Sequence, residues 1–269
     1  MAINALQSSA SALSALSTGL DIIANNLANV NTQGFKSSRA NFQDLLYIEK
    51  AQPGVENANG DQRPTGLYVG LGTKVAGTQL SFTQGAPQST GNDLDLMIEG
   101  RGFFQVQVDA ERAAGGLAYT RAGAFAKNAD GDIVLASGDG RILEPQITIP
   151  DDAVKVEIMQ SGEVWIQVNG ENQPQQIGQL EIAGFVNPSG LEQVGENLFI
   201  ETAASGPPIT GVPGETGLGI IQQRFLEASN VDPTIELIGL IKTQRAFEMN
   251  SQSIRASDDI LRNVAQLNR

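Results

Sequence analysis

Two carboxylates spaced two residues apart are the first candidates for chemistry in this sequence. Asp93 and Asp95 lie in NDLDLMIEG, where polar and apolar residues alternate. Residues two apart on a strand point to the same face, so the two carboxylates would be neighbours. Such a pair can act as general acid and base. No pocket-forming pattern accompanies it, so we interpret both residues as part of a solvated sheet face.

Two further motifs resemble ligand-binding loops but lack residues that those loops require. Gly100 and Gly102 lie in EGRGFF, which is followed by a strand-like pattern and not by the helix of a phosphate-binding loop. NADGD, residues 128–132, resembles the start of a calcium loop, but Ser137 stands where the closing glutamate belongs. We interpret both motifs as turns between strands. The only tryptophan, Trp165, is expected to pack in the core and not to stack on a ligand.

The composition excludes several kinds of site. The chain has no cysteine and no histidine, which removes disulfides, thiolate nucleophiles, imidazole bases and the common zinc ligands. No nucleophile, base and oxyanion donor can be combined from what remains. The sequence therefore predicts a protein that is not an enzyme and that holds no metal or cofactor.

The charge is distributed unevenly along the chain. The formal net charge is −13, which argues against nucleic acid and anionic membranes as partners. Residues 1–50 carry three basic and three acidic groups, and residues 226–269 carry five basic and six acidic groups. The acidic excess therefore lies between them. Neutral ends can pack against copies of themselves, whereas an acidic middle stays solvated.

No segment has the pattern of a membrane span or a secretion signal. There is no run of about 20 apolar residues. The N-terminus shows neither a basic region nor a continuous apolar region, so we expect no cleaved signal peptide. These features alone favour a cytoplasmic protein without membrane insertion.

Two segments with a heptad pattern, one near each end of the chain, are the first elements that could position functional residues. Residues 6–30 repeat apolar positions with alternating spacings of three and four, which predicts a long helix with a coiled-coil seam. Asp232 and Pro233 predict the N-cap and first turn of a second helix. The seam positions are Leu6, Leu13, Leu16, Leu20, Ile23, Leu27 and Val30, and then Leu240, Phe247, Ile254 and Leu261, with Leu237 and Ile241 widening the second seam.

The first helix has unusual outer faces. Residues 1–20 contain no charged side chain and are rich in serine and alanine. A solvated helix normally carries charged pairs on its outer face. We therefore expect this helix to be approached by neighbours from several sides. The alternative is an ordinary intramolecular coiled coil that only closes the protein.

Between the helices the pattern changes to that of β-strands. Alternating runs rich in Val, Ile and Phe, separated by Gly, Asn-Gly and Asp-Gly turns, predict an all-β domain over residues 71–205. We expect an α+β fold in which residues 1–35 and 226–269 pair as a coiled-coil-like helical module. Residues 36–70 are expected to be an extended linker and residues 206–225 a return connection.

Both ends of the chain carry recognisable signatures. IIANNLANVNTQGFK resembles the N-terminal signature of flagellar rod and hook proteins, and LEASNVDPTIELIGLIKTQRAFEMNSQSI resembles their C-terminal signature. GLYVGLGTKV, GRGFFQV, YTRAGAF and GENLFIETAASGPP are similar to the middle of distal-rod members. Residues 45–67 resemble an insertion of distal-rod proteins. The matching residues are Asn25, Asn26, Asn29, Gly34, Phe35, Ser229, Asn230, Val231, Gln244, Arg245 and Ala246, with Gln52, Pro53 and Gly54 in the insertion.

The resemblance implies a structural subunit of the bacterial flagellar distal rod. Copies would stack into a hollow helical drive shaft between motor and hook, with the terminal helices inside and the β domain outside. The implied partners are other copies, proximal-rod and hook-junction proteins, the surrounding ring proteins and the flagellar type III export apparatus. Export without cleavage would bring the chain to the periplasm-spanning basal body.

Other functions remain open at this point. A hook or proximal-rod subunit is the alternative within the family, and the 45–67 segment favours the distal rod. A secreted adhesin-like binding protein is the alternative from another class, and an enzyme is the least favoured. We also expect the asparagines of the first signature to satisfy backbone groups across a subunit boundary. Asn29 or Asn31 could adopt left-handed geometry where the helix stops, and Gly34 would allow a sharp exit.

Overall fold

The computed structural model describes residues 2–54, 64–109, 112–113, 115–170 and 173–267. Helix α1 (Ala2–Ala28) begins the chain and helix α2 (Pro233–Leu267) ends it, and the described region between them contains only strands and one short 3₁₀ turn, η1 (Pro188–Gly190). The α+β fold class is thus confirmed. The chain forms two compact units. We call Met1–Ala28, Ser38–Leu80 and Asp232–Arg269 the helical unit, and Asn29–Ser37 with Ser81–Val231 the β unit.

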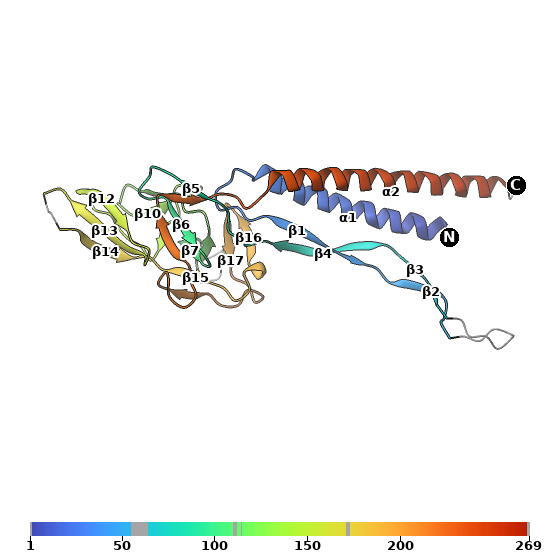
Figure 1. Ribbon diagram of the computed structural model, residues 1–269, viewed down its shortest axis with the longest axis horizontal. Coiled ribbons are helices and arrows are strands. Elements are labelled where there is room, and N and C mark those ends of the chain that lie inside the picture. Colours follow the sequence, from blue (N-terminus) through green and yellow to red (C-terminus); the bar gives the residue numbers. More distant parts are fainter. Residues whose placement is uncertain (1, 55–63, 110–111, 114, 171–172, 268–269) are drawn as a thin grey trace. The chain divides into compact units, whose positions relative to one another are not determined.

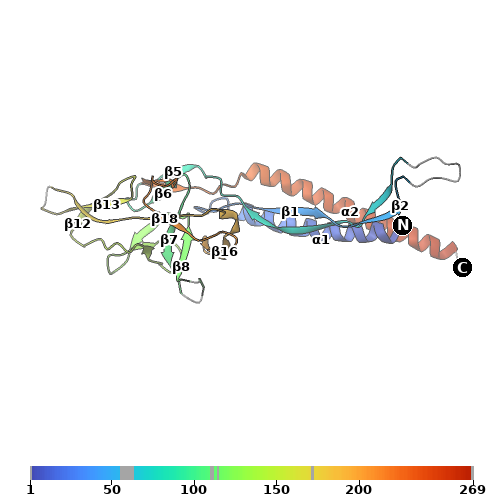
Figure 2. The same ribbon diagram turned by 90° about the horizontal axis from the view of Figure 1, so that it is seen from below.

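The helical unit consists of the two helices and one long β-hairpin. Strands β1 (Ser38–Asp44) and β4 (Thr73–Leu80) pair antiparallel, and β2 (Tyr47–Ala51) and β3 (Leu67–Gly70) continue the hairpin. Helix α1 lies between α2 and the β1–β4 ladder in Figure 1, and Figure 2 shows the hairpin running along α1. Asp232 caps α2 as expected, because its Oδ1 accepts the Thr234 amide at 2.8 Å.

The serines of α1 have an intramolecular use. Ser8 Oγ donates to the Gly70 carbonyl at 3.4 Å, and Ser11 Oγ accepts the Thr73 amide at 3.3 Å. Small side chains let the hairpin backbone approach the helix closely. Part of the uncharged surface of α1 is therefore covered by the hairpin of the same chain, and not by a neighbouring copy as the sequence suggested.

The two helices pack through a seam that is only partly covered. All the seam positions expected in residues 6–30 are half-buried, and so are Leu240, Ile254 and Leu261 in α2. Phe247, also expected in the seam, is instead 38% exposed. Ile23 packs beside Gly239, because a Cβ added to Gly239 would lie 3.6 Å from Cδ1 of Ile23. Leu237 and Ile241 were expected to widen this seam, and that expectation is wrong. Both are about half exposed, because they lie on other faces of α2.

The β unit is built from one larger sheet and several smaller ones. The larger sheet has the order β16–β17–β8–β7–β15–β18, with β11 also on β7, and a three-stranded sheet has the order β12–β13–β14. Three separate two-stranded sheets, β9–β10, β19–β6 and β20–β5, complete the β unit. The strands are β5 (Pro87–Ser89), β6 (Leu96–Glu99), β7 (Phe103–Gln107), β8 (Leu117–Thr120), β9 (Phe125–Lys127), β10 (Ile133–Leu135), β11 (Leu143–Glu144), β12 (Ala153–Ile158), β13 (Glu163–Val168), β14 (Gln175–Gln179), β15 (Ile182–Gly184), β16 (Glu192–Gly195), β17 (Leu198–Ile200), β18 (Ile209–Gly211), β19 (Ile220–Gln223) and β20 (Phe225–Glu227).

The strand map corrects three expected boundaries. The region 36–70 is not an extended linker, since β1, β2 and β3 lie in it. Strand β4, assigned from sequence to the β domain, pairs with β1 in the helical unit. The region 206–225 is not only a connection, because β18 and β19 lie in it. Gly, Asn and Pro in these stretches are typical of loops, but pairing between separate segments of the chain makes them strands.

The hydrophobic core of the β unit gathers residues from most of its strands. Phe104, Phe125, Ile133, Leu143, Ile182 and Ile221 are among its fully buried members. Phe104 and Phe125 meet edge to face at a centroid distance of 5.2 Å. Tyr119 on β8 is also buried, with its ring 4.8 Å from that of Phe185.

Burial gives Tyr119 a measurable signature. Burial, with a smaller contribution from the Glu201 charge, raises the pKa of Tyr119 to about 12. Because the pKa is raised on folding, the stabilisation is complete below about pH 10 and is lost as the pH rises towards 12. In an absorbance titration of tyrosinate we expect one of the three tyrosines to ionise only near pH 12. Tyr119→Phe should remove this late step alone; a late step that persists in this variant would contradict the assignment.

Candidate assembly surfaces and the buried tie

The first signature contains a buried side-chain amide near the end of α1. Asn26 is 2% exposed. Its Oδ1 accepts the Ser38 amide at 3.0 Å, and its Nδ2 donates to the Ser38 carbonyl at 2.8 Å and to Glu236 Oε1 at 3.1 Å. These bonds tie the start of β1 and the first turn of α2 to α1. The expectation that this amide serves a neighbouring subunit is therefore wrong for Asn26.

The chain turns after α1 at a glycine. Gly34 has a φ of 69°, whereas neither Asn29 nor Asn31 has a positive φ, so only the expectation for Gly34 is confirmed. The amide of Gly34 donates to the Glu227 carbonyl at 2.8 Å. A Cβ at position 34 would lie 2.6 Å from the Ala122 nitrogen. Asn29 instead takes part in a turn, where its Oδ1 accepts the Thr32 hydroxyl at 3.0 Å.

Three charged side chains form a cluster inside the β unit. Lys36 Nζ lies 2.5 Å from Glu227 Oε1, and Arg121 Nη1 lies 3.3 Å from Glu227 Oε2. All three side chains are buried. The Gly85 amide also donates to Glu227 Oε1 at 2.8 Å, and Lys36 donates to the Thr83 carbonyl at 2.9 Å. One carboxylate thus serves two cations and a backbone amide.

The cluster carries an excess of positive charge. Burial lowers the pKa of Lys36, while the Glu227 carboxylate opposes that shift and the Arg121 charge adds to it. Arg121 also donates to the Ile98 carbonyl at 3.1 Å and to the Gly100 carbonyl at 2.5 Å. Its guanidinium carbon lies 5.4 Å from the centre of the Phe103 ring. Glu227 neutralises only one of the two positive charges. Carbonyl oxygens and an aromatic face therefore compensate part of the remaining positive charge.

The C-terminal signature binds to the same place through Asn230. Its Oδ1 accepts the Ser37 amide at 2.7 Å, and its Nδ2 donates to the Ser81 carbonyl at 2.8 Å. The backbone N–H of Asn230 donates to the Phe35 carbonyl at 3.3 Å, and the neighbouring Val231 is buried. Ser229 Oγ accepts the Val231 amide at 3.3 Å. We call residues 34–37 and 227–231 with Arg121 the buried tie, since they join the two signature segments inside the β unit.

The signature residues that remain lie at the surface. Asn25, Gln244 and Arg245 are exposed and Ala246 is half-buried. Gln52, Pro53 and Gly54 follow β2 and are exposed, and residues 55–63 of the proposed insertion lie outside the described part of the chain. The sequence interpretation missed Lys36, Arg121 and Glu227 as functional residues. Lys36 directly follows Phe35, and Glu227 directly follows Phe225 and Leu226. A charge beside a large apolar residue in a signature is the signal that could have indicated them.

Helix α2 presents apolar side chains that the described residues of its own unit leave uncovered. They share exposed fractions between 47% and 67%, and they are Ile235, Leu237, Ile238, Ile241, Met249 and Ile260. The seam towards α1 occupies a different face of the helix. Apolar residues on more than one face of a surface helix indicate packing against further partners.

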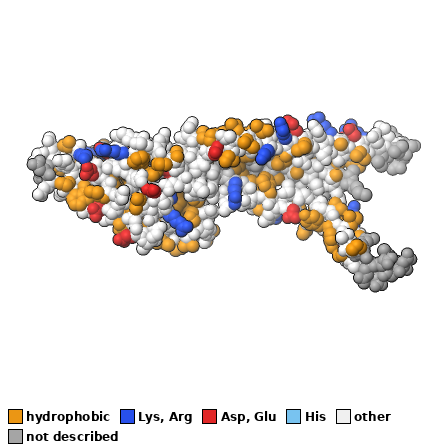
Figure 3. Space-filling view, viewed as in Figure 1, with side chains coloured by type: hydrophobic (Ala, Val, Ile, Leu, Met, Phe, Trp, Pro, Cys, Tyr) orange, Lys and Arg blue, Asp and Glu red, His pale blue; other side chains and the backbone are white. Residues whose placement is uncertain are grey.

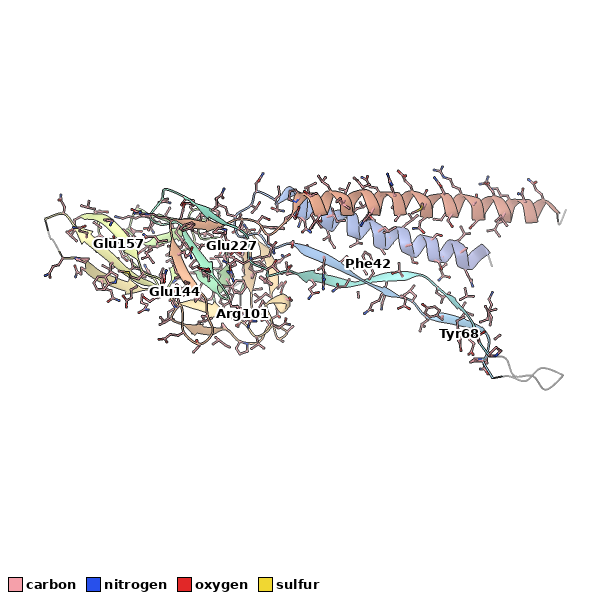
Figure 4. All side chains as sticks on the ribbon, viewed as in Figure 1. Phe42, Tyr68, Arg101, Glu144, Glu157 and Glu227 are labelled. Atoms are coloured by element: carbon pink, nitrogen blue, oxygen red, sulfur yellow. The ribbon has the colours of Figure 1, made fainter. Side chains whose placement is uncertain are left out.

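The hairpin of the helical unit carries a second exposed apolar surface. It comprises Phe42, Leu46, Tyr47, Ile48, Leu67 and Tyr68, of which Leu46 is the most exposed at 82%. Figure 3 shows hydrophobic side chains gathered on this arm, and Figure 4 labels Phe42 and Tyr68 along it. We call this set the hairpin surface.

The small-molecule candidates from the sequence do not combine into a site. Asp93 lies in a turn and pairs with Arg224 at 2.6 Å, whereas Asp95 is buried and accepts from Asn92 at 3.0 Å, so the expected shared face is wrong. NADGD is a hairpin turn, as expected, in which Asn128 Oδ1 accepts two amides. Gly100 and Gly102 lie between β6 and β7, also as expected.

Two further observations concern the remaining candidates. Trp165 is half-buried on the sheet face opposite Val164 and Ile166, so its expected place in the core is wrong. Within the described residues, no group of three acidic side chains is arranged to hold a metal ion. None of the described helices is long and apolar enough to cross a membrane.

Comparison with protein families places three segments of the chain among flagellar proteins. Residues 6–36 match the family described as flagella basal body rod protein. Residues 97–166 match the D1 domain of flagellar hook protein FlgE/F/G, and residues 222–267 match the C-terminal region of flagellar basal body rod FlgEFG proteins. The class of protein is thus that of the axial components of the flagellum.

Curated relatives align over nearly the whole chain. The flagellar basal-body rod protein FlgG of Caulobacter vibrioides is 43% identical over 98% of this chain and 99% of its own. The FlgG of Agrobacterium fabrum is 44% identical over 96% of this chain and 97% of its own. The FlgF rod protein of Caulobacter vibrioides is 35% identical over 98% of this chain and 97% of its own. The chain belongs to the flagellar basal-body rod protein family, and within it is most like FlgG. It is a structural rod subunit of the flagellar basal body and not an enzyme.

Proposed function

We propose that this subunit builds the distal section of the rod by stacking head to tail into a hollow helical polymer. A contact that joins two different surfaces and does not close into a ring produces an open filament. The observation that carries the proposal is the exposed apolar surface of α2, which the described part of its own unit leaves uncovered. In a tube, neighbouring helices would bury it.

The proposal includes a coiled-coil-like pairing of α1 and α2 in the inner tube. The least exposed positions of α2 recur with spacings of four and three from Glu236 to Leu261, which is the spacing of such a seam. Several seam positions are polar or small, among them Thr243, Asn250 and Ser257. Such a seam is weak alone, so the pairing would gain stability from neighbouring copies.

The proposed partners follow from the place of the subunit in the axial structure. They are further copies of this chain, proximal-rod and hook-junction proteins, the rings around the rod and the flagellar type III export apparatus. The similarity to FlgG across almost the full chain supports the distal rod over the hook or proximal rod. It also speaks against the secreted adhesin considered from the sequence.

Electron microscopy of basal bodies from a strain that lacks the gene tests the proposal. We expect a short rod stub without a hook. A complete rod without a hook would assign the subunit to the hook, and absence of the whole rod would assign it to the proximal rod. Intact flagella would contradict a required role in the rod.

The hairpin surface gives a separate prediction about stiffness. Leu46→Ser together with Leu67→Ser removes exposed apolar side chains, so the free energy of monomer unfolding should change by less than about 0.5 kcal/mol. Lateral contacts in the polymer should weaken, and rods should bend more in electron micrographs. Lys50→Ser, also exposed on β2, is the matched control and should leave bending unchanged. Equal bending of the double variant and this control would contradict the role of the hairpin surface.

A further inference from the structure

The β unit contains an aromatic groove that the rod function described so far does not use. It has a volume of about 450 Å³ and is lined by Phe82, Phe103, Phe185 and Leu218. Phe103 lies 5.4 Å from Phe82 and 5.8 Å from Phe185, between ring centres. Val186 and Ile209 also line it and are 80% and 50% exposed. Large apolar side chains left this exposed around a hollow indicate a binding surface.

The groove is positively charged, although the whole chain has a net charge of −13. Arg101 and Arg121 line it, and none of the described lining residues is acidic. Arg121 belongs to the buried cluster in which two cations share one carboxylate. Among the described residues no carboxylate lies within ion-pair distance of Arg101. The groove therefore suits an apolar side chain that is accompanied by a carboxylate.

One segment of the β unit has that chemistry. Val154 lies on the edge strand β12, where the register with β13 shifts between Ala153 and Lys155. Such a bulge turns a side chain out of the regular pattern, and Val154 is 71% exposed. The exposed Asp152 precedes it by two residues. Together they form an apolar projection beside a negative charge.

We propose that the aromatic groove of one copy receives Val154 and Asp152 of a second copy, with Asp152 near Arg101. Strand β12, on which Figure 4 labels Glu157, lies in a different part of the β unit from Arg101, so we assign the occupant to a second copy. The contact joins unlike surfaces and would therefore continue along a filament. This inference rests on the proposed helical polymer and identifies a contact between β units within it.

Disulfide trapping tests the contact, because the chain has no native cysteine. A variant with Val154→Cys and Val186→Cys carries one new thiol on each proposed surface. After mild oxidation of purified basal bodies, a non-reducing gel should show a ladder of cross-linked chains, since a disulfide requires Cα atoms within about 7 Å. Each single variant should give no ladder, because the contact pairs two different surfaces.

The outcomes separate this inference from the proposed function. A ladder in the double variant supports the groove contact. Assembled rods without a ladder overturn it, while the rod function stands. A ladder from Leu46→Cys with Val186→Cys, in place of the first pair, would show that the hairpin surface fills the groove and would also overturn it.

A charge exchange keeps the proposal testable if the cysteine variant does not assemble. Arg101→Glu and Asp152→Lys should each place like charges opposite one another and lower the amount of assembled rod at least about threefold. The two changes together should restore it. Two single losses without restoration in the double variant would overturn the pairing, and so would the absence of any loss.

Discussion

Glu227→Gln is expected to lower the free energy of unfolding by about 3–5 kcal/mol, because it leaves two buried cations without their carboxylate. Glu227 is paired with Lys36 at 2.5 Å and with Arg121 at 3.3 Å. Glutamine keeps the shape and the hydrogen-bonding oxygen but not the charge. Urea denaturation of the purified monomer measures the loss.

Two control variants separate charge from packing. Asp93→Asn removes one partner of a half-exposed ion pair with Arg224 and should cost about 1 kcal/mol or less. Lys36→Met removes the excess cation and leaves Arg121 paired one to one with Glu227, so it should cost less than Glu227→Gln. Losses of similar size in Glu227→Gln and Asp93→Asn would contradict the account of the cluster.

The consequence for the rod follows from what the buried tie connects. The segments before and after it in the chain lead to α1 and to α2. If Glu227→Gln loosens the tie, the chain should assemble poorly even though the apolar surface of α2 is unchanged. Motility in soft agar should fall with the loss of stability across the three variants. A variant that is strongly destabilised but fully motile would show that assembly does not depend on the buried tie.

Local patterns were sufficient to predict the helices of this fold. The heptad positions of α1 and the cap at Asp232 depend on residues within a few turns of one another, so periodicity and capping chemistry identify them. Local patterns do not predict strands β1 to β3, because each of these strands pairs with a segment that lies many positions away in the chain. Ser38 pairs with Leu80, for example, across 42 positions of the chain.

The candidate site was predictable in its outline and not in its contacts. The signatures marked both halves of the buried tie by resemblance. Arg121 lies 85 positions from Lys36 and 106 from Glu227, so no local pattern could assign it to their cluster. The same limit explains the error about Asn26, since an amide at a helix end looks the same in sequence whether its partner is Ser38 of the same chain or a neighbouring copy.

Gly34→Ala is expected to cost about 3 kcal/mol or more, which exceeds the cost of a left-handed backbone alone. The φ of Gly34 is 69°, and an added Cβ would lie 2.6 Å from the Ala122 nitrogen and 2.7 Å from the Arg121 carbonyl carbon. Backbone atoms cannot move aside as a flexible side chain can. Relief would require residues 121 and 122 to shift, and that shift would displace the guanidinium that holds Glu227.

Gly140→Ala is the matched control for this effect. Gly140 has a φ of 66°, but nothing lies within 4 Å of its added Cβ, so only the backbone strain of about 1–2 kcal/mol should appear. Urea denaturation should therefore show a clear gap between the two alanine variants, and soft-agar motility should fall in Gly34→Ala alone. Equal losses would mean that the close approach at Ala122 is relieved without cost, and that the turn after α1 tolerates any residue able to adopt a positive φ.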